Sequence, residues 1–253
     1  MARAYHFRPA AAAGQDRPFV VLLPGASGLR ILDDDGHYFR VAAALQAHGF
    51  DALVVDYKTA YRAATDPPGG SAGDKIAFVL RHALAWSTRH GWLRPNARGF
   101  VVAWSLGAEG LWHTLPDGAT CARLGLCGAV AYYPTNEEDA ALRTDLPLLI
   151  LTGDADDVTP VEAIGDAVEH RPRRDDRVLL RVFRGAHHGF DVSSLPPRKT
   201  MRLLPWVGPK VTFGYDRAAA AEAMAELLAF LRRWAPADSS PGEEFGPSHA
   251  GDR

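Results

Sequence analysis

The sequence contains little cysteine: only Cys121 and Cys127 occur among its 253 residues. Two thiols this close along the chain could form a disulfide, but without an export signal such pairs more often stay reduced. A structural zinc site needs cysteines and histidines at short, regular spacings, and the sequence has no such cluster. We therefore favour free thiols and expect no bound metal.

Long apolar runs are also missing. No segment approaches the roughly 18 continuous apolar residues of a membrane-spanning helix. The N-terminal stretch MARAYHFRPA mixes histidine and arginine with apolar residues and lacks the apolar core of an export signal. We expect a soluble, cytoplasmic protein that does not bind membranes.

The sequence has no excess of positive charge. Its formal net charge is -2, and no dense block of lysine and arginine occurs. The electrostatic pattern of proteins that bind nucleic acids or anionic membranes is therefore absent. The expected partner is a small molecule, and the sequence does not indicate an oligomeric state.

Short apolar segments alternate with longer segments of helical periodicity. This alternation is typical of a parallel sheet covered by helices, whose strands are apolar throughout because both faces of the sheet are buried. The predicted strands are residues 19–24, 51–57, 99–104, 128–133, 147–153 and 178–185. The predicted fold class is α/β, with a mostly parallel central sheet and helices on both of its faces.

Three segments have strong helical periodicity, and they set the limits of the domain. Helices are expected over residues 37–48, 74–90 and 215–234, with Gly49 ending the first and Asp216 capping the last. We expect residues 1–18 to be an N-terminal extension, 19–234 to be one domain, and the Pro-, Gly- and Ser-rich residues 235–253 to be a disordered tail. Residues 191–214 are expected to form a long loop, which is often functional.

Ser105 is the first candidate catalytic residue. It lies between a predicted strand and a helix-like segment in the stretch VVAWSLGAEG. A nucleophile at such a turn usually has the frame G-x-S-x-G, and here Ala103 replaces the first glycine. The physical requirement is only that residues two before and two after the serine are small, and Ala103 and Gly107 meet it. The stretch alone leaves open whether Ser105 is a nucleophile or a structural serine.

Candidates for a base and an acid follow two other predicted strands. A serine becomes nucleophilic when a histidine takes its proton and a carboxylate orients that histidine. Asp154, Asp156 and Asp157 follow the strand that ends at residue 153, and we expect two of them only to cap the next helix in a solvated turn. His187 and His188 follow the strand over 178–185. The chain order Ser, Asp, His is that of the α/β-hydrolases.

A glycine-containing loop follows the first predicted strand. The loop PGASG spans residues 24–28 and could supply one backbone N–H to stabilise an oxyanion, with Leu106 supplying another. A phosphate-binding turn is the alternative for this loop. It lacks both the G-x-G-x-x-G spacing and the Lys-Ser/Thr ending of nucleotide sites. We therefore favour an oxyanion hole.

These motifs resemble those of the dienelactone hydrolase family of α/β-hydrolases. The resemblance extends from about Phe19 to Trp234 and rests on VVLLPGASGL, AWSLGAEG, TGDADDVTP and GAHHGF. It implies an α/β-hydrolase fold without a large lid. It also implies that the triad consists of Ser105, Asp156 and His188, although the best-known members of the family have a cysteine nucleophile.

The resemblance implies a mechanism of acyl transfer to water. Asp156 would orient His188, His188 would deprotonate Ser105, and the backbone amides of Ala26 and Leu106 would stabilise the oxyanion. No metal or organic cofactor is required. Pro24 stands where many α/β-hydrolases have a histidine before the glycine, which leaves the backbone donors in place.

The substrate is expected to be a small ester or lactone. Only about a dozen residues separate Tyr133 from Pro147, too few for a large helical lid. The candidates for substrate contacts are Trp104 and Tyr133 near strand ends, and Tyr57, Lys58 and Arg198 on connecting segments. The alternatives are a related triad enzyme acting on amide or carbon–carbon bonds, an acyltransferase, and a non-catalytic binding module of the same fold.

Overall fold

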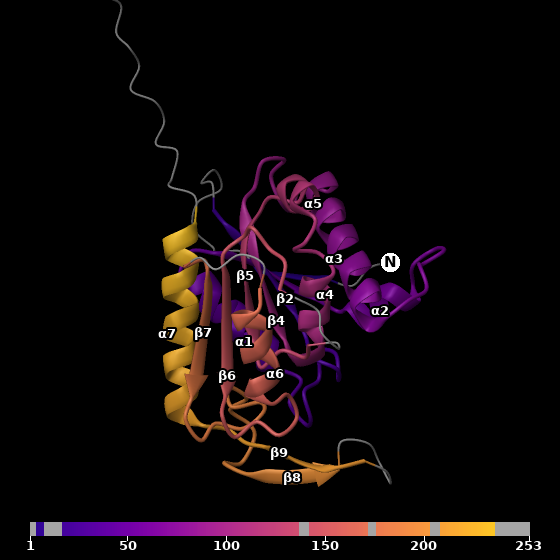
Figure 1. Cartoon of the computed structure of the whole chain (residues 1–253). Helices are drawn as coiled ribbons and strands as arrows, with labels where there is room; N and C mark the ends of the chain where they lie inside the picture. The colour runs from indigo at the N-terminus through magenta and orange to yellow at the C-terminus, as the bar shows by residue number, and fades with distance from the viewer. Residues whose placement is uncertain (1–3, 8–16, 137–141, 172–175, 203–207, 236–253) are drawn as a thin grey trace, which may run out of the picture.

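A seven-stranded sheet forms the centre of the molecule (Figure 1). The computed structural model describes residues 4–7, 17–136, 142–171, 176–202 and 208–235. The strand order is β1-β3-β2-β4-β5-β6-β7, and the six strands β2 to β7 run parallel to one another. The strands are β1 Ala4–Phe7, β2 Phe19–Leu23, β3 Asp51–Val55, β4 Gly99–Trp104, β5 Leu126–Tyr132, β6 Leu148–Gly153 and β7 Val178–Phe183. All six predicted strands are confirmed to within two residues at each end.

Strand β1 was missed by the sequence analysis. It lies within the predicted N-terminal extension and pairs antiparallel with β3 at one edge of the sheet. Only four residues long, it carries a histidine between aromatic residues and gives no extended apolar run. Edge strands need less apolar sequence than central ones because they are only partly covered.

Helices cover both faces of the sheet and bury two separate apolar clusters. Helices α1, His37–Ala47, and α7, Arg217–Trp234, pack on one face. The other face carries α2 Tyr57–Arg62, α3 Ala72–Arg89, α4 Glu109–Trp112, α5 Gly118–Arg123 and α6 Val161–Glu169. The central strands are buried on both faces, which explains why their sequences are apolar throughout.

The three predicted helices are confirmed, as are two of their ends. Gly49 follows α1 with a φ angle of 90°, a conformation that glycine adopts without strain. The Asp216 side chain accepts hydrogen bonds from the backbone amides of the first turn of α7. The expectation that aspartates cap α6 was wrong, because Pro160 occupies the cap position and no side chain caps the helix.

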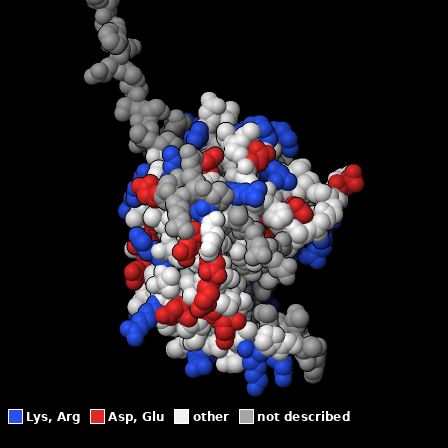
Figure 2. All heavy atoms as spheres, viewed as in Figure 1, with Lys and Arg blue, Asp and Glu red and all other residues white. Residues whose placement is uncertain are grey.

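The segment predicted as a long loop contains a β-hairpin. Strands β8, Lys199–Arg202, and β9, Lys210–Phe213, pair antiparallel and project from the end of the molecule where the parallel strands finish. Lysine and arginine side chains gather over this end of the surface (Figure 2). The backbone amide of Thr212 donates to Asp157, which fixes the hairpin beside the segment that follows β6.

The remaining expectations concern the C-terminal tail, the two cysteines, membrane-spanning helices and metal ligands. Residues 236–253, nearly all of the predicted tail, are not among those described. Cys121 and Cys127 are both free. Among the described residues, no helix is long and apolar enough to cross a membrane, and no group of three or more potential metal ligands occurs.

Replacing Asp216 by alanine should lower the free energy of unfolding by about 1 kcal/mol. The side chain accepts hydrogen bonds from Ala218 N at 2.9 Å and Ala219 N at 3.0 Å, and alanine leaves both donors without this partner. Urea denaturation measures the change. Asp216→Ser, which restores an acceptor, should recover most of the loss, and equal stability of the alanine and wild-type proteins would contradict the capping role.

Candidate active site

Ser105 lies at the sharp turn between strand β4 and the helix that follows it. The 3₁₀ helix η1, Ser105–Ala108, begins directly after β4 and continues into α4. Ser105 has a φ angle of 48°, in the left-handed region that costs a non-glycine residue roughly 1–3 kcal/mol. A strained strand-to-helix turn of this kind exposes the side chain of its central residue beyond the carboxyl end of the strand.

Small residues let this turn pack closely against strand β2. A Cβ atom on Gly107 would lie 2.5 Å from the carbonyl oxygens of Leu23 and Pro24, so the site accepts only glycine without rearrangement. On the strand side, Ala103 is completely buried and pairs with Leu23. The alanine that replaces the usual first glycine is therefore accommodated in the turn around Ser105.

His188 follows strand β7, and contacts to both its backbone and its ring fix its position. Its carbonyl oxygen accepts a hydrogen bond from Gly214 N at 3.1 Å, just beyond β9. Its ring lies against Tyr133, with ring centroids 4.4 Å apart, and edge-on to Phe213 at 5.3 Å. The residue is only 3% exposed, so these neighbours fix the orientation of the imidazole.

The two adjacent histidines make different contacts. The Nε2 atom of His188 lies 3.1 Å from the Oγ atom of Ser105. The Nδ1 atom of His187 lies 2.8 Å from the carbonyl oxygen of Ala155. Of the two candidates that the sequence offers, His188 therefore lies within hydrogen-bond distance of the serine.

The three aspartates after β6 also differ. The Oδ2 atom of Asp156 lies 2.8 Å from Nδ1 of His188, and Asp156 is only 5% exposed. Asp154 and Asp157 are exposed and accept hydrogen bonds from backbone amides elsewhere. The structure thus brings Ser105, His188 and Asp156 together in one hydrogen-bonded series from three separate strand ends.

The surroundings of Asp156 keep its carboxyl group ionised. Burial raises the pKa of this group, but the hydrogen bond and charge of His188 and the backbone amides of Thr159 and Val158 outweigh it, so the pKa is lowered overall. Val158 N and Thr159 N both donate to Oδ1 at 2.9 Å, and the Thr159 hydroxyl donates to Oδ2 at 3.0 Å. These contacts leave Oδ2 directed at the histidine.

The predicted oxyanion donors lie on either side of Ser105. Leu106 is the second residue of η1, where a backbone N–H has no acceptor within the helix. Ala26 is exposed in a turn closed by a hydrogen bond from Gly28 N to Gly25 O. Among the described residues, neither amide has a hydrogen-bond acceptor.

Two tyrosines hold the peptide groups of Gly25, next to this turn. The backbone amide of Gly25 donates to the Tyr38 hydroxyl at 3.0 Å, and the Tyr57 hydroxyl donates to the Gly25 carbonyl oxygen at 2.9 Å. A Cβ atom on Gly25 would lie 3.4 Å from the Cβ atom of Ser105, so the loop packs directly against the strained turn. The two hydroxyls thereby fix the position of the Ala26 amide.

Three of the candidates for substrate contacts are buried and bonded to the protein. Trp104 and Tyr133 are fully buried, and both donate hydrogen bonds to Asp191. Tyr57 is 6% exposed, and its hydroxyl is directed at Gly25. These three side chains therefore support the residues of the site from the protein interior.

The other two candidates are exposed. Lys58 follows Tyr57 at the start of α2, and its aliphatic carbons lie beside Gly28, which closes the turn that contains Ala26. Arg198 lies just before β8 in the segment that leads to the hairpin. A contact between either side chain and a substrate remains a prediction.

Several residues of the site were not found from the sequence. Tyr38, Asp191 and His37 lie outside the quoted motifs, and each contacts a predicted site residue or its support. Thr159 lies within TGDADDVTP but was not singled out, and it contacts Asp156 only three residues away. The partners of Asp191 and His37 are distant along the chain and become neighbours only in the folded molecule. The aspartate that follows GAHHGF was the single signal available, because it lies three residues after His188.

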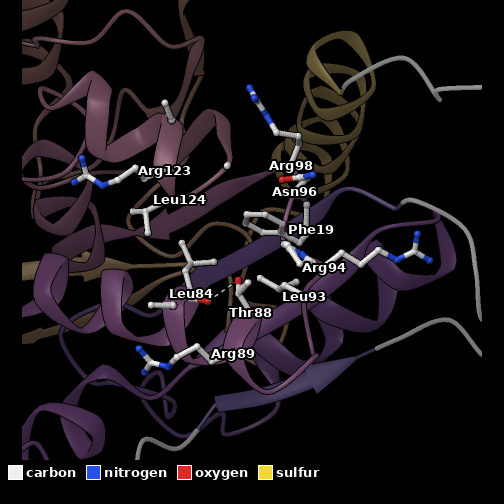
Figure 3. Close-up of a pocket in the computed structure, with 15 residues that line it drawn as sticks. Phe19, Leu84, Thr88, Arg89, Leu93, Arg94, Asn96, Arg98, Arg123 and Leu124 are labelled. Carbon is white, nitrogen blue, oxygen red and sulfur yellow. Dashed lines mark hydrogen bonds between the residues drawn. The ribbon is translucent and has the colours of Figure 1, made fainter.

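A cavity of about 740 Å³ lies at the end of the sheet where strands β2 and β4 begin, away from Ser105. Its apolar wall includes Phe19, Leu84 and Leu93, at or near the ends where β2 and β4 begin. Four arginines surround it, and Figure 3 shows their guanidinium groups directed outward rather than converging on the cavity. This cavity is separate from the site at Ser105, which follows the opposite end of β4.

Comparisons with known proteins concern the family and the fold of this chain. Residues 119–235 match the model of the dienelactone hydrolase family. The predicted resemblance to this family is confirmed. The matched residues include Asp156 and His188, whereas Ser105 precedes them. No curated protein matches the sequence. The match to the dienelactone hydrolases supports hydrolase activity.

Solved structures share the fold over nearly the whole chain. A protein from Klebsiella pneumoniae, provisionally assigned as a dienelactone hydrolase, has a TM-score of 0.65 at 21% identity and covers 92% of this chain and 93% of its own. Thermogutta terrifontis esterase 2 gives 0.62 at 18% identity, with 93% and 91% covered. A serine hydrolase without a lid from Xanthomonas campestris gives 0.60 at 18% identity, with 92% and 89% covered. The fold is that of the α/β-hydrolases, as predicted.

The stabilising contribution of ionised Asp156 should disappear in acid. Because its pKa in the folded protein is below the ordinary value of 3.8, the contribution is complete above that value and is lost as the pH falls through the folded-state pKa. At pH 5, Asp156→Asn should lower the free energy of unfolding by about 1–3 kcal/mol, since it removes a buried, charge-assisted acceptor.

Urea denaturation of both proteins at pH 5, 4 and 3 measures this difference. The difference between wild type and Asp156→Asn should narrow as the pH falls, while ionisations common to both proteins cancel. A difference that stays constant between pH 5 and pH 3 would show that Asp156 does not have a lowered pKa in the folded protein.

Proposed function

We propose that this protein is a serine hydrolase that cleaves small carboxylic esters or lactones through an acyl-enzyme on Ser105. The observation that carries the proposal is the buried hydrogen-bonded series from Ser105 Oγ to His188 Nε2, at 3.1 Å, and from His188 Nδ1 to Asp156 Oδ2, at 2.8 Å. These distances are within the range required for proton transfer from a nucleophile to a base.

In the first half-reaction, His188 accepts the proton of Ser105 while the serine oxygen attacks the carbonyl carbon of the substrate. Asp156 accepts a hydrogen bond from Nδ1 and stabilises the imidazolium that forms. His188 then gives the proton to the leaving alcohol, and the acyl group stays on Ser105. In the second half-reaction, water attacks the acyl-enzyme with His188 again acting as the base.

The negative charge on the tetrahedral intermediates requires donors that are already in place. The backbone amides of Leu106 and Ala26 are proposed to supply them, at the start of η1 and in the turn after β2. Each donor of this kind is worth about 3–4 kcal/mol of transition-state stabilisation in other hydrolases. The hydrogen bonds of Gly25 to Tyr38 and Tyr57 hold one of the two donors before a substrate arrives.

Preference for small esters or lactones is supported by the connection between β5 and β6. Residues 133–147 join these strands, which is too short a segment to contain a helical lid over Ser105. Thermogutta terrifontis esterase 2, which shares the fold, is phosphonylated by cyclosarin. A phosphonate is therefore a suitable probe for a nucleophile in the same position of the fold.

Labelling with a fluorophosphonate probe tests the nucleophile and the base. Wild type should label at one site, Ser105→Ala should not label, and His188→Ala should label at least about 100-fold more slowly because the proton acceptor is gone. His187→Ala is the matched control and should label at close to the wild-type rate. Failure of the wild type to label would overturn the proposal, and labelling of Ser105→Ala would assign the nucleophile elsewhere.

A parallel screen of p-nitrophenyl acetate, short lactones, p-nitroanilides and acyl-acceptor alcohols tests the substrate class. Hydrolysis of the esters or lactones in preference to the anilides is expected. Faster anilide cleavage would favour the amide alternative, and transfer to added alcohol in preference to water would favour an acyltransferase.

Tyr57→Phe separates two roles for this residue. If its hydroxyl holds the Gly25 carbonyl oxygen, as the 2.9 Å hydrogen bond indicates, kcat for p-nitrophenyl acetate should fall about 3- to 10-fold with KM nearly unchanged. If Tyr57 binds the substrate, as the sequence analysis suggested, KM should rise instead. Steady-state kinetics give both parameters, with Tyr61→Phe on the same helix as the control.

A further inference from the structure

Asp191 is a buried carboxylate in the segment that follows His188. Its side chain is 11% exposed and lies among donors from three other parts of the fold. The indole Nε1 of Trp104 donates to Oδ2 at 2.8 Å, and the hydroxyl of Tyr133 donates to Oδ1 at 2.7 Å. The Nε2 atom of His37, at the start of α1, lies 3.3 Å from Oδ2.

These donors keep the buried carboxyl group ionised. Burial raises the pKa of Asp191, but the proximity of His37 and the hydrogen bonds from Tyr133 and Trp104 lower it overall. A buried charge is costly and is seldom the most stabilising choice, because well-packed apolar residues can often replace it. An ionised aspartate at this position is therefore better explained by a role in the site than by stability.

Two of the donors adjoin the reacting groups. Trp104 is the last residue of β4 and immediately precedes Ser105 at the strained turn. Tyr133 packs its ring against the imidazole of His188, with centroids 4.4 Å apart. A shift of either aromatic side chain would therefore move the serine or the histidine.

Tyr133 is also connected to Asp156, through Thr159. Its carbonyl oxygen lies 3.2 Å from the Thr159 hydroxyl, whose single proton is shared between this oxygen and Oδ2 of Asp156 at 3.0 Å. The backbone of Tyr133 has a φ angle of 34°, a conformation that a bulky residue adopts only when its surroundings enforce it. The hydrogen bond from its hydroxyl to Asp191 is one such constraint.

We propose that Asp191 is a positioning residue: its buried carboxylate holds Trp104 and Tyr133 so that the imidazole of His188 stays in line between Asp156 and Ser105. This inference rests on the hydrolase reaction proposed above. Asp191 itself does not contact Ser105 or the proposed oxyanion donors. It acts through the two aromatic side chains, and its loss should impair turnover more than substrate binding.

Asp191→Asn tests this role with the smallest change of shape. Asparagine keeps the size and one acceptor oxygen but removes the charge and one of the two hydrogen-bonded acceptors. For p-nitrophenyl acetate, kcat should fall about 10- to 100-fold with KM within about 2-fold of wild type, the scale expected when catalytic groups are displaced by a fraction of an ångström to 1 Å. The rate of fluorophosphonate labelling should fall by a similar factor.

Tyr133→Phe isolates one arm of the network. It retains the ring against His188 and removes only the hydroxyl that donates to Asp191. We expect kcat to fall about 3- to 10-fold, and the double variant to be no slower than Asp191→Asn alone, because both changes break the same connection. This variant also tests the proposal if Asp191→Asn fails to fold.

Asp117→Asn is the matched control. Asp117 also accepts hydrogen bonds, from Thr120, but it lies at the start of α5, near the opposite end of the molecule from the β8–β9 hairpin (Figure 1). It should leave kcat unchanged while altering stability. Circular dichroism and thermal denaturation confirm that each variant is folded under the assay conditions.

Kinetics and a crystal structure of Asp191→Asn together decide between the outcomes. If wild type is active and the variant has the same kcat, or if its His188–Ser105 distance is unchanged, the positioning role is overturned. If wild type neither labels nor hydrolyses esters, the proposed function fails. The crystal structure then still tests Asp191, because displacement of His188 relative to Ser105 supports the positioning role and an unchanged arrangement overturns it.

Discussion

The close contact between the turn at Ser105 and the end of strand β2 determines the geometry of the candidate site. Gly107 lies so near the Leu23 and Pro24 carbonyl oxygens that no side chain fits, and Ser105, two residues earlier, has a left-handed backbone conformation. The strain of that conformation, about 1–3 kcal/mol, is offset by the burial of β4 on both faces. The same contact brings the loop after β2 against the serine, so the proposed nucleophile and the proposed oxyanion donors are held by the same packing contact.

The remaining parts of the site depend on the parallel sheet. In such a sheet, the segments that follow neighbouring strands all leave from one edge, where open α/β folds bind their ligands. Asp156 follows β6 and His188 follows β7, and these strands are neighbours in the sheet. Strand β9 and the residue after it then contact both segments, because the Thr212 amide donates to the Asp157 carboxylate and the Gly214 amide donates to the carbonyl oxygen of His188. The parallel strands therefore place Asp156 and His188 near each other, and the contacts of strand β9 and the residue after it fix the segments that carry them.

The sequence predicted those features that have a local physical cause. The central strands were found because burial on both faces requires apolar runs. Strand ends and chain order gave Ser105 and the aspartate and histidine candidates, and the resemblance to the dienelactone hydrolase family selected Asp156 and His188 among them. The hairpin was missed because KTMR and KVTF are only four residues long and each begins with a lysine, so neither gives an extended apolar run. The contacts of Tyr57 with Gly25 and of Asp191 with Trp104 join segments far apart in the chain, and no local pattern encodes them.

The two tyrosine hydroxyls that hold Gly25 have a thermodynamic consequence. The loop is held at both the N–H and the C=O of Gly25, so it loses conformational entropy when the protein folds. Little further entropy is then lost from the loop when a ligand binds. Burial raises the pKa of both Tyr38 and Tyr57, so neither hydroxyl ionises near neutral pH and both hydrogen bonds persist. Because this loop does not rearrange, such a site selects its ligands by how well their shape and charge match a rigid surface.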